Sequence, residues 1–297
     1  MDIQWYPGHM VKTKKMIKQN LRLVDVVLEL VDARAPLSTK LPDVDSLVGS
    51  REIITVLNKA DLADKKVTEM WINYFKNRGI PAVSVDTLRK TGFKRLFSLI
   101  NSVKKRSLLG SRRCMIIGVP NVGKSSLMNQ MAGRKSARTA DVPGVTRSKM
   151  WLKVSDNLEL LDTPGILWPK FEDKAVGIKL AMLGSIKEDL LDLQQLAFIL
   201  IKFLSIYYPE RLKSRYNLNT NIPPLQALEK IAASRGFFLE GGILDIERSA
   251  KTIITEFRQG KIGAISLERP EEKEGFWIDI SNQDIVCGRG FYYANRK

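Results

Sequence analysis

The sequence contains few of the residues that crosslink or staple small proteins. Only Cys114 and Cys287 occur among its 297 residues, and His9 is the single histidine. Two distant cysteines supply neither a disulfide framework nor a zinc-finger pattern. No apolar run approaches the ~20 residues that span a bilayer. Neither a myristoylation signal after Met1 nor a cysteine for prenylation near Lys297 is present. We expect no membrane association and a reducing compartment such as the cytoplasm.

Acidic residues are scarce in the first part of the chain. Residues 1–185 hold 32 Lys and Arg against 17 Asp and Glu, a net charge of +15, whereas residues 186–297 hold 16 against 15. The stretch from Arg89 to Arg113 has nine basic residues and no acid. Because phosphates attract basic surfaces by counterion release, this imbalance predicts a nucleic-acid partner. The alternative is an ordinary solvated helix face.

Short apolar runs alternate with helical patterns in the first part of the chain, which predicts an α/β sheet. The expected strands are 24–31, 53–57, 82–85, 114–119, 150–154 and 158–161. The expected helices between them are 10–22, 65–77, 93–105, 125–131 and 173–183. After about residue 186 only helical patterns remain, at 189–208, 223–235 and 243–259. We expect an α/β domain over 1–185, a helical domain over 186–265 and a tail over 266–297 that no pattern assigns.

A glycine-rich segment has the spacing of a phosphate-binding loop. Residues 118–125 read Gly-Val-Pro-Asn-Val-Gly-Lys-Ser, between an expected strand and an expected helix. The pattern G-x-x-x-x-G-K-[S/T] arises by chance in about one chain in a hundred of this length. Its backbone N–H groups surround phosphates, and the following helix N-terminus favours anions. Nucleotide contacts are therefore expected from Asn121, Val122, Gly123, Lys124, Ser125 and Ser126.

The charged and hydroxyl side chains of the phosphate site have distinct expected roles. Lys124 reaches the β and γ phosphates, and Ser125 offers its hydroxyl to Mg²⁺. The ion also needs a carboxylate, expected from Asp162 in the downstream motif Asp-Thr-Pro-Gly. Gly165, the last residue of that motif, can present its N–H to the γ-phosphate.

A second motif, Asn58-Lys59-Ala60-Asp61, follows the strand expected at 53–57. The Asp61 carboxylate can accept hydrogen bonds from guanine N1–H and the N2 amino group, which adenine lacks. Lys59 lays its stem along the base, and Ser84 begins a loop that resembles the one supplying a backbone N–H to guanine O6. Alone, the motif could be a solvated strand-end loop; with the phosphate loop it predicts GTP over ATP.

These motifs occur in an unusual order. In an ordinary Ras-like GTPase the phosphate motifs precede the base motif, but here Asn58 and Ser84 precede Gly118 and Asp162. Chain termini of a domain often lie close together, so a permutation can keep the site. The fold expected is therefore α/β, a circularly permuted Ras-like P-loop GTPase domain followed by an all-helical domain.

Six segments together resemble the ribosome biogenesis GTPase A (YlqF) family of circularly permuted GTPases. They are residues 5–10 (Trp-Tyr-Pro-Gly-His-Met), 31–34 (Val-Asp-Ala-Arg), 58–61, 118–125, 143–146 (Pro-Gly-Val-Thr) and 162–170. The resemblance implies an RNA-binding helical domain, association with the large ribosomal subunit precursor and GTP hydrolysis stimulated by the ribosome. The near-neutral helical part departs from that expectation of RNA binding.

Water activation needs a residue other than the usual glutamine, because Ile166 follows Gly165. The resemblance implies a catalytic role for His9, whose pKa near ~6.5 suits an orienting group; the alternative is that His9 packs or caps the first helix. Asn121 resembles the asparagine of potassium-dependent GTPases, or is a turn residue. Thr146 resembles the switch threonine that closes on Mg²⁺ and γ-phosphate, or is a surface threonine.

The function expected is a GTPase that drives a late step in large (50S) subunit maturation, monomeric away from the ribosome. A regulatory GTPase switch with another RNA or protein partner is the alternative. A scaffold that binds RNA without hydrolysis is disfavoured by the intact set of Lys124, Ser125, Thr146 and Asp162.

Overall fold

The computed structural model describes residues 15–42, 44–105, 110–133, 151–167, 173–219, 221–270, 276, 277 and 279. These form two compact units. The sheet unit contains the described residues up to Leu167 together with Glu268–Pro270. The helical unit contains those from Asp173 to Leu267 and residues 276, 277 and 279.

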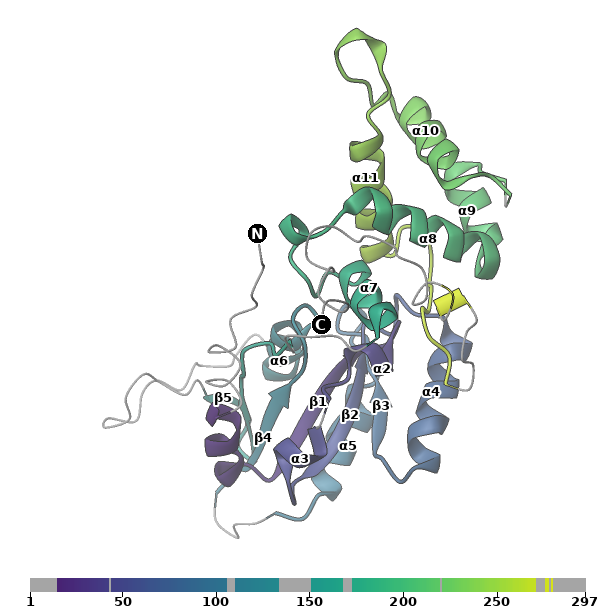
Figure 1. Ribbon diagram of the computed structural model, residues 1–297. Helices are drawn as coiled ribbons and strands as arrows, with labels where there is room; N and C mark the ends of the chain where they lie inside the picture. Colours follow the sequence, from purple (N-terminus) through teal and green to yellow (C-terminus); the bar gives the residue numbers. More distant parts are fainter. Residues whose placement is uncertain are drawn as a thin grey trace, which may run out of the picture. The chain divides into compact units, whose positions relative to one another are not determined.

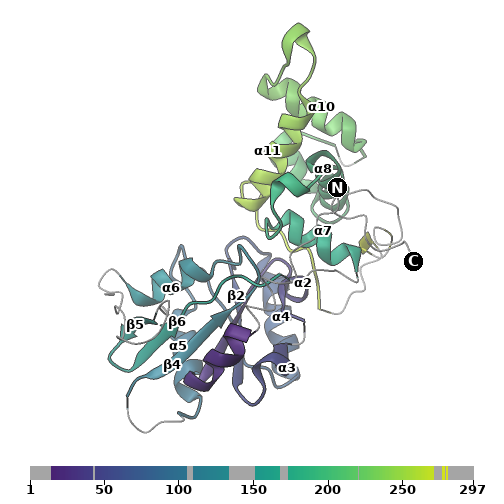
Figure 2. The same ribbon diagram turned by 60° about the vertical axis from the view of Figure 1, so that its left-hand side comes forward.

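A six-stranded sheet flanked by helices forms the sheet unit (Figures 1 and 2). Its strand order is β3-β2-β1-β4-β6-β5, parallel throughout except for β5, which runs antiparallel to β6. The strands are β1 (Val26–Asp32), β2 (Glu52–Asn58), β3 (Ala82–Ser84), β4 (Arg112–Ile117), β5 (Trp151–Ser155) and β6 (Leu158–Leu161). Every residue of β1 is buried, as expected of a central parallel strand covered on both faces.

Helices connect most of these strands. They are η1 (Leu21–Leu23), α2 (Pro36–Thr39), α3 (Val44–Val48), α4 (Lys65–Asn77), α5 (Phe93–Ser102) and α6 (Lys124–Ala132), and residues 15–20 are also helical. The bounds of α4 agree with the prediction. Asp64 caps it by accepting from Lys66 N at 2.8 Å, and Val67, Trp71 and Phe75 bury one face. The short helices α2 and α3 were not predicted, because four or five residues show no helical period.

In the described part of the helical unit, all the regular elements longer than a single bridge are helices. They are α7 (Lys174–Met182), η2 (Glu188–Leu190), α8 (Leu193–Tyr207), α9 (Pro209–Tyr216), α10 (Pro224–Arg235), η3 (Glu240–Gly242) and α11 (Ile246–Arg258). The buried Glu256 of α11 accepts hydrogen bonds from Arg215, Tyr216 and Arg235. Burial raises the pKa of Glu256, but these donors outweigh it and lower the pKa to about 2. One carboxylate therefore ties α9 and α10 to α11.

The two units divide at a different place from the expected boundary at residue 185. Helix α7 belongs to the helical unit, where Arg258 of α11 donates to the Met182 and Ala181 carbonyls at 3.0 and 2.8 Å. Within the described residues, no helix is both long and apolar enough to cross a membrane.

Part of the expected tail returns to the sheet unit. The Glu268 carboxylate accepts from the backbone N–H groups of Leu37 at 2.9 Å and Ser38 at 3.1 Å, and also from the Ser38 hydroxyl. The Glu268 carbonyl accepts from Trp71 Nε1 at 3.1 Å. Glu268 therefore supplies hydrogen-bond acceptors for the backbone N–H groups of α2 and for the buried indole N–H of Trp71.

Candidate functional site

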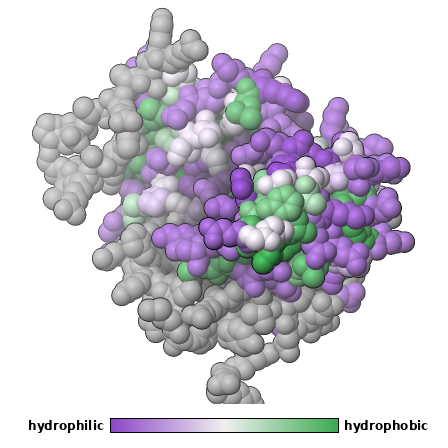
Figure 3. All heavy atoms as spheres, turned by 90° about the horizontal axis from the view of Figure 1, so that it is seen from above, coloured by the Kyte–Doolittle hydropathy of each residue, from purple (hydrophilic) through white to green (hydrophobic). Residues whose placement is uncertain are grey.

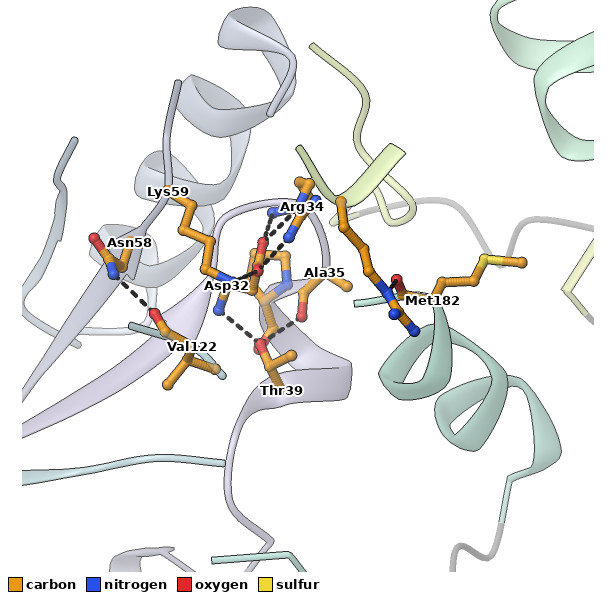
Figure 4. Close-up of polar contacts among 10 residues, drawn as sticks. Asp32, Arg34, Ala35, Thr39, Asn58, Lys59, Val122 and Met182 are labelled. Carbon is orange, nitrogen blue, oxygen red and sulfur yellow. Dashed lines mark hydrogen bonds and ion pairs between the residues drawn. The ribbon is translucent and has the colours of Figure 1, made fainter. Parts of the chain in front are cut away.

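The base motif and the phosphate loop meet at one buried hydrogen bond. Strands β2 and β4 are both parallel to β1, which lies between them, so their carboxyl ends face the same edge of the sheet. There Asn58 Nδ2 donates to Val122 O at 2.8 Å (Figure 4). Ligands of open α/β sheets bind at that edge. The structure therefore joins two motifs 64 residues apart into one site.

Glycine is required where the phosphate loop packs against the base loop and against β1. Gly123 has a φ of +94°, and a Cβ there would lie 2.3 Å from Asn58 Nδ2. Gly118, with a φ of +154°, would place its Cβ 2.5 Å from the Leu30 carbonyl oxygen. Both contacts are too short for any real side-chain carbon. The phosphate loop therefore packs too closely against Asn58 and β1 to carry a side chain at either position.

Lys124 begins α6 and points back across the phosphate loop. Its Nζ donates to Val119 O at 2.8 Å and to Gly118 O at 3.1 Å. Burial lowers the pKa of Lys124 to about 8, against the opposing effect of the Asp162 charge. Ser125 and Ser126 are exposed in the first turn of the same helix, whereas Val122 of the phosphate loop is buried. Two backbone carbonyls of the phosphate loop thus hold the Lys124 amino group within the loop.

The Asp162 motif lies against the phosphate loop. Ile166 N donates to Gly118 O at 3.1 Å, and Thr163 Oγ1 donates to Ile116 O at 2.5 Å. A Cβ on Gly165 would lie 3.1 Å from Lys124 Nζ, so glycine keeps the lysine close. Burial raises the pKa of Asp162, and Lys124 partly offsets that effect. A half-buried carboxylate whose charge is disfavoured is suited to a cation, and Mg²⁺ prefers oxygen ligands of this kind.

The base loop lies at the same edge of the sheet as the phosphate loop. Lys59 adopts a positive φ of 57°, and Asp61 follows it half-buried. Burial, and then the charge of Asp86, raise the pKa of Asp61. Both effects would be relieved by two N–H donors on the carboxylate. Asn58 Oδ1 is buried and has no hydrogen-bond partner among the described residues, so it is a further acceptor at this edge.

The loop that follows Ser84 at the end of β3 is hydrogen-bonded to the base loop. Ala60 N donates to Val85 O at 3.2 Å, and Val85 N donates to Leu57 O at 2.8 Å. The buried Asp86 carboxylate accepts from the backbone of Leu88 and Arg89, which closes the loop. Gly92, with a φ of +84°, allows this loop to turn, because a Cβ there would lie 2.1 Å from the Ser84 carbonyl oxygen.

A buried ion cluster beside the base loop was not identified as functional from the sequence. Asp32 at the end of β1 accepts from Arg34 at 2.9 and 2.8 Å and lies 3.1 Å from Lys59 Nζ (Figure 4). Burial opposes the charge, but Arg34 and Lys59 lower the pKa of Asp32 far below its ordinary value. Asp32 N also donates to Thr39 Oγ1 at 2.9 Å. The available signal was the segment 31–34 (Val-Asp-Ala-Arg), which contributed to the family resemblance but was given no role of its own.

Two expected catalytic residues, His9 and Thr146, lie outside the described residues. Asn121 is described: it is exposed, with a left-handed φ of 62°, at the turn of the phosphate loop. The structure therefore brings together the base, phosphate and Asp162 motifs, and leaves the roles of His9, Thr146 and Asn121 as predictions.

Comparisons with known proteins agree with this architecture. A family model described as 50S ribosome-binding GTPase matches residues 113–216. Ribosome biogenesis GTPase A of Priestia megaterium is 43% identical over 286 residues, covering 92% of this chain and 99% of that protein. The protein of the same name from Thermotoga maritima is 35% identical over 274 residues, covering 91% of this chain and 95% of that protein.

Solved structures show the same likeness in three dimensions. The crystal structure of GNP-bound YlqF from T. maritima superposes with a TM-score of 0.65 and 32% identity, covering 88% of this chain and 99% of that one. A GDP-bound YlqF structure has a TM-score of 0.65 at 31% identity, covering 86% of this chain and 100% of that one. Both the permuted motif order and the fold predicted from it are confirmed. The chain therefore belongs to the ribosome biogenesis GTPase A (YlqF) family of circularly permuted GTPases, enzymes that hydrolyse GTP in ribosome biogenesis.

Proposed function

We propose that this GTPase drives a late step in maturation of the large (50S) ribosomal subunit. The observation that carries the nucleotide part is the Asn58–Val122 hydrogen bond, which unites the base motif and the phosphate loop. The relatives named for ribosome biogenesis and the +15 charge of residues 1–185 support the ribosomal partner. The assembly role implies a cytoplasmic protein, which we take to be monomeric away from the particle.

The residues around the Asn58–Val122 hydrogen bond bind different parts of GTP. Asp61 accepts from guanine N1–H and N2, which compensates for the burial that raises the pKa of its carboxyl group. Lys59 lies along the base, and the loop from Ser84 offers a backbone N–H to guanine O6. Lys124 and the backbone N–H groups of residues 121–126 hold the phosphates, and Gly165 donates its N–H to the γ-phosphate.

Metal ions and the attacking water complete the proposed mechanism. Ser125, Asp162 and Thr146 would hold Mg²⁺, which supplies charge neutralisation at the β and γ phosphates when bound. Asn121 is a candidate ligand for K⁺. Ile166 is apolar and buried, so it cannot orient water. We propose that His9 does so when the protein is bound to the particle.

The RNA contact is proposed for both parts of the chain. The family resemblance assigns RNA binding to residues 186–265, yet that part is nearly neutral. On the sheet unit, Lys94 and Arg95 of α5 face outward, while Leu96 and Ile100 bury its opposite face. Arg113 instead pairs with Glu159 at 2.9 Å. We therefore propose that α5 presents the outward part of the basic stretch to rRNA.

GTP turnover measured with and without large-subunit precursor particles tests the proposal. We expect slow turnover alone and a clear stimulation by these particles, but none by small subunits. Equal turnover under all three conditions would refute the assembly role and favour a regulatory switch with another partner.

A further inference from the structure

The loop between α10 and α11 exposes large apolar side chains close together. Residues 236–245, here called the tip, extend beyond the ends of both helices in the helical unit (Figures 1 and 2). Phe238 is 52% exposed, Leu239 54% and Ile243 64%. Seen from above, apolar side chains form a patch within a hydrophilic surface (Figure 3). Single exposed apolar residues are ordinary, but such a cluster on a projecting loop indicates an interaction site.

The tip is an ordered structure and not a loose loop. Phe238 and Leu244 form an antiparallel bridge, and Leu239 N donates to Ile243 O at 2.8 Å. At the base of the tip, Phe237 N donates to Ala232 O and Asp245 N donates to Phe237 O, both at 2.9 Å. Gly241 and Gly242 make the turn, with φ angles of +80° and +78°. The backbone that carries the apolar side chains is therefore ordered before any partner arrives, which lowers the entropy cost of binding.

Charge distinguishes the tip from the rest of this basic chain. Between Arg235 and Arg248 there are three acids and no base, although the whole chain has a net charge of +16. A basic group lies only at the base of the described tip, where the Arg248 guanidinium is 4.3 Å from the centroid of the Phe237 ring. Asp245 caps α11 by accepting from Arg248 N at 2.9 Å, whereas Glu240 and Glu247 are exposed. Acidic side chains around an apolar cluster repel phosphate and attract a surface rimmed by Lys and Arg.

We propose that the tip docks into an apolar pocket, rimmed by basic residues, on a protein component of the large-subunit precursor. Phe238, Leu239 and Ile243 fill the pocket, and Glu240 pairs with the basic rim. This inference rests on the proposed function for the identity of the particle. It differs in assigning a protein contact, and not an RNA contact, to the end of the helical unit.

Site-specific crosslinking on purified precursor particles tests which partner is present. Phe238→p-benzoylphenylalanine should crosslink to a peptide of a particle protein that contains apolar residues flanked by Lys or Arg. Crosslinks to RNA alone, or none while the protein remains bound, would overturn the inference and leave the proposed function standing. Failure of the wild-type protein to bind the particles would refute the proposed function, and this inference with it.

Matched variants add a quantitative test. Phe238→Ser combined with Ile243→Ser should weaken particle binding about tenfold or more, as expected for anchors that fill a pocket. Ile206→Ser is the control, since Ile206 lies on α8 in the same unit and is 61% exposed. Melting temperatures establish that each variant is folded. Equal affinities of the double variant and the control would contradict the proposal.

The sign of a charge reversal separates the two kinds of partner. Glu240→Lys should weaken binding if the rim is basic and strengthen it if phosphates lie there. Glu210→Lys, an exposed position in the first turn of α9, makes the same charge change elsewhere in the helical unit. Tighter binding of Glu240→Lys relative to Glu210→Lys would overturn the proposal in favour of RNA.

Discussion

Asn58→Ala should damage nucleotide binding as a whole, because Asn58 joins the base loop to the phosphate loop. The side chain is fully buried, and its Nδ2 donates to Val122 O at 2.8 Å. Removing it leaves a buried carbonyl without this donor, which costs about 1–3 kcal/mol. If that energy holds the two loops in register, the Kd for GDP should rise about 5- to 150-fold, at 1.4 kcal/mol for each factor of ten.

Calorimetric titration with GDP measures this effect without interference from hydrolysis. Asn101→Ala is a suitable control, because Asn101 is exposed on α5 in the same unit and should change neither affinity nor melting temperature. A second comparison uses the Asp61→Asn background, in which xanthosine diphosphate replaces GDP. In that background, Asn58→Ala should weaken the binding of xanthosine diphosphate by about the same factor as it weakens the binding of GDP in the protein with Asp61. The reason is that the Asn58–Val122 contact supports the phosphate loop whichever base is bound.

Two results would refute this reasoning. An unchanged Kd for GDP would show that the loops keep their register without Asn58. A loss confined to guanine nucleotides would show that Asn58 serves the base alone, and that the Val122 contact contributes nothing to the phosphate site.

Further predictions concern single roles within the proposed mechanism. Asp61→Asn should reduce the preference for GTP and favour xanthosine triphosphate in competition binding, since an amide presents a donor where guanine also donates; unchanged selectivity would contradict the base assignment. Burial lowers the pKa of Lys124 to about 8, and bound phosphates favour its charged form. GDP affinity should therefore fall as the pH rises above about 8, by at most one log unit per pH unit. This pH dependence should vanish in Lys124→Ala. Lys94→Glu with Arg95→Glu should flatten the salt dependence of particle binding, because each phosphate that these side chains no longer neutralise reduces the log–log slope by nearly one unit; an unchanged slope would make α5 an ordinary solvated helix. His9→Ala should keep GDP affinity and melting temperature but lose roughly ten- to a thousandfold of particle-stimulated kcat, whereas full stimulated turnover would exclude a catalytic role.

The motifs that bind nucleotide could be predicted from the sequence, because their chemistry depends on neighbours along the chain. A phosphate loop needs glycines and a lysine within one turn before a helix, and residues 118–125 meet that need locally. The order of the motifs also predicted the permuted sheet. The bounds of α4 could be predicted for a similar reason, because its cap and its apolar period both lie within the segment.

Boundaries and short elements were harder to predict. Nothing in the sequence placed α7 in the helical unit, since an apolar helix can pack against either partner. Helix α9 was missed because its eight residues are mostly polar and bury only Leu212. The contact of Glu268 with α2 could not be predicted either, because a single glutamate forms no sequence pattern.

The class of fold, the nucleotide chemistry and the family are all encoded in residues at fixed local spacing, so the unfolded chain already specifies them. Which distant groups share the site depends instead on the folded arrangement. Folding brings Asn58 to Val122 across 64 residues, and Glu268 to Ser38 across 230. It also makes Asp32 the ion partner of Lys59. Such contacts follow from strand order and burial, because the sheet edge that collects these loops exists only once the chain has folded.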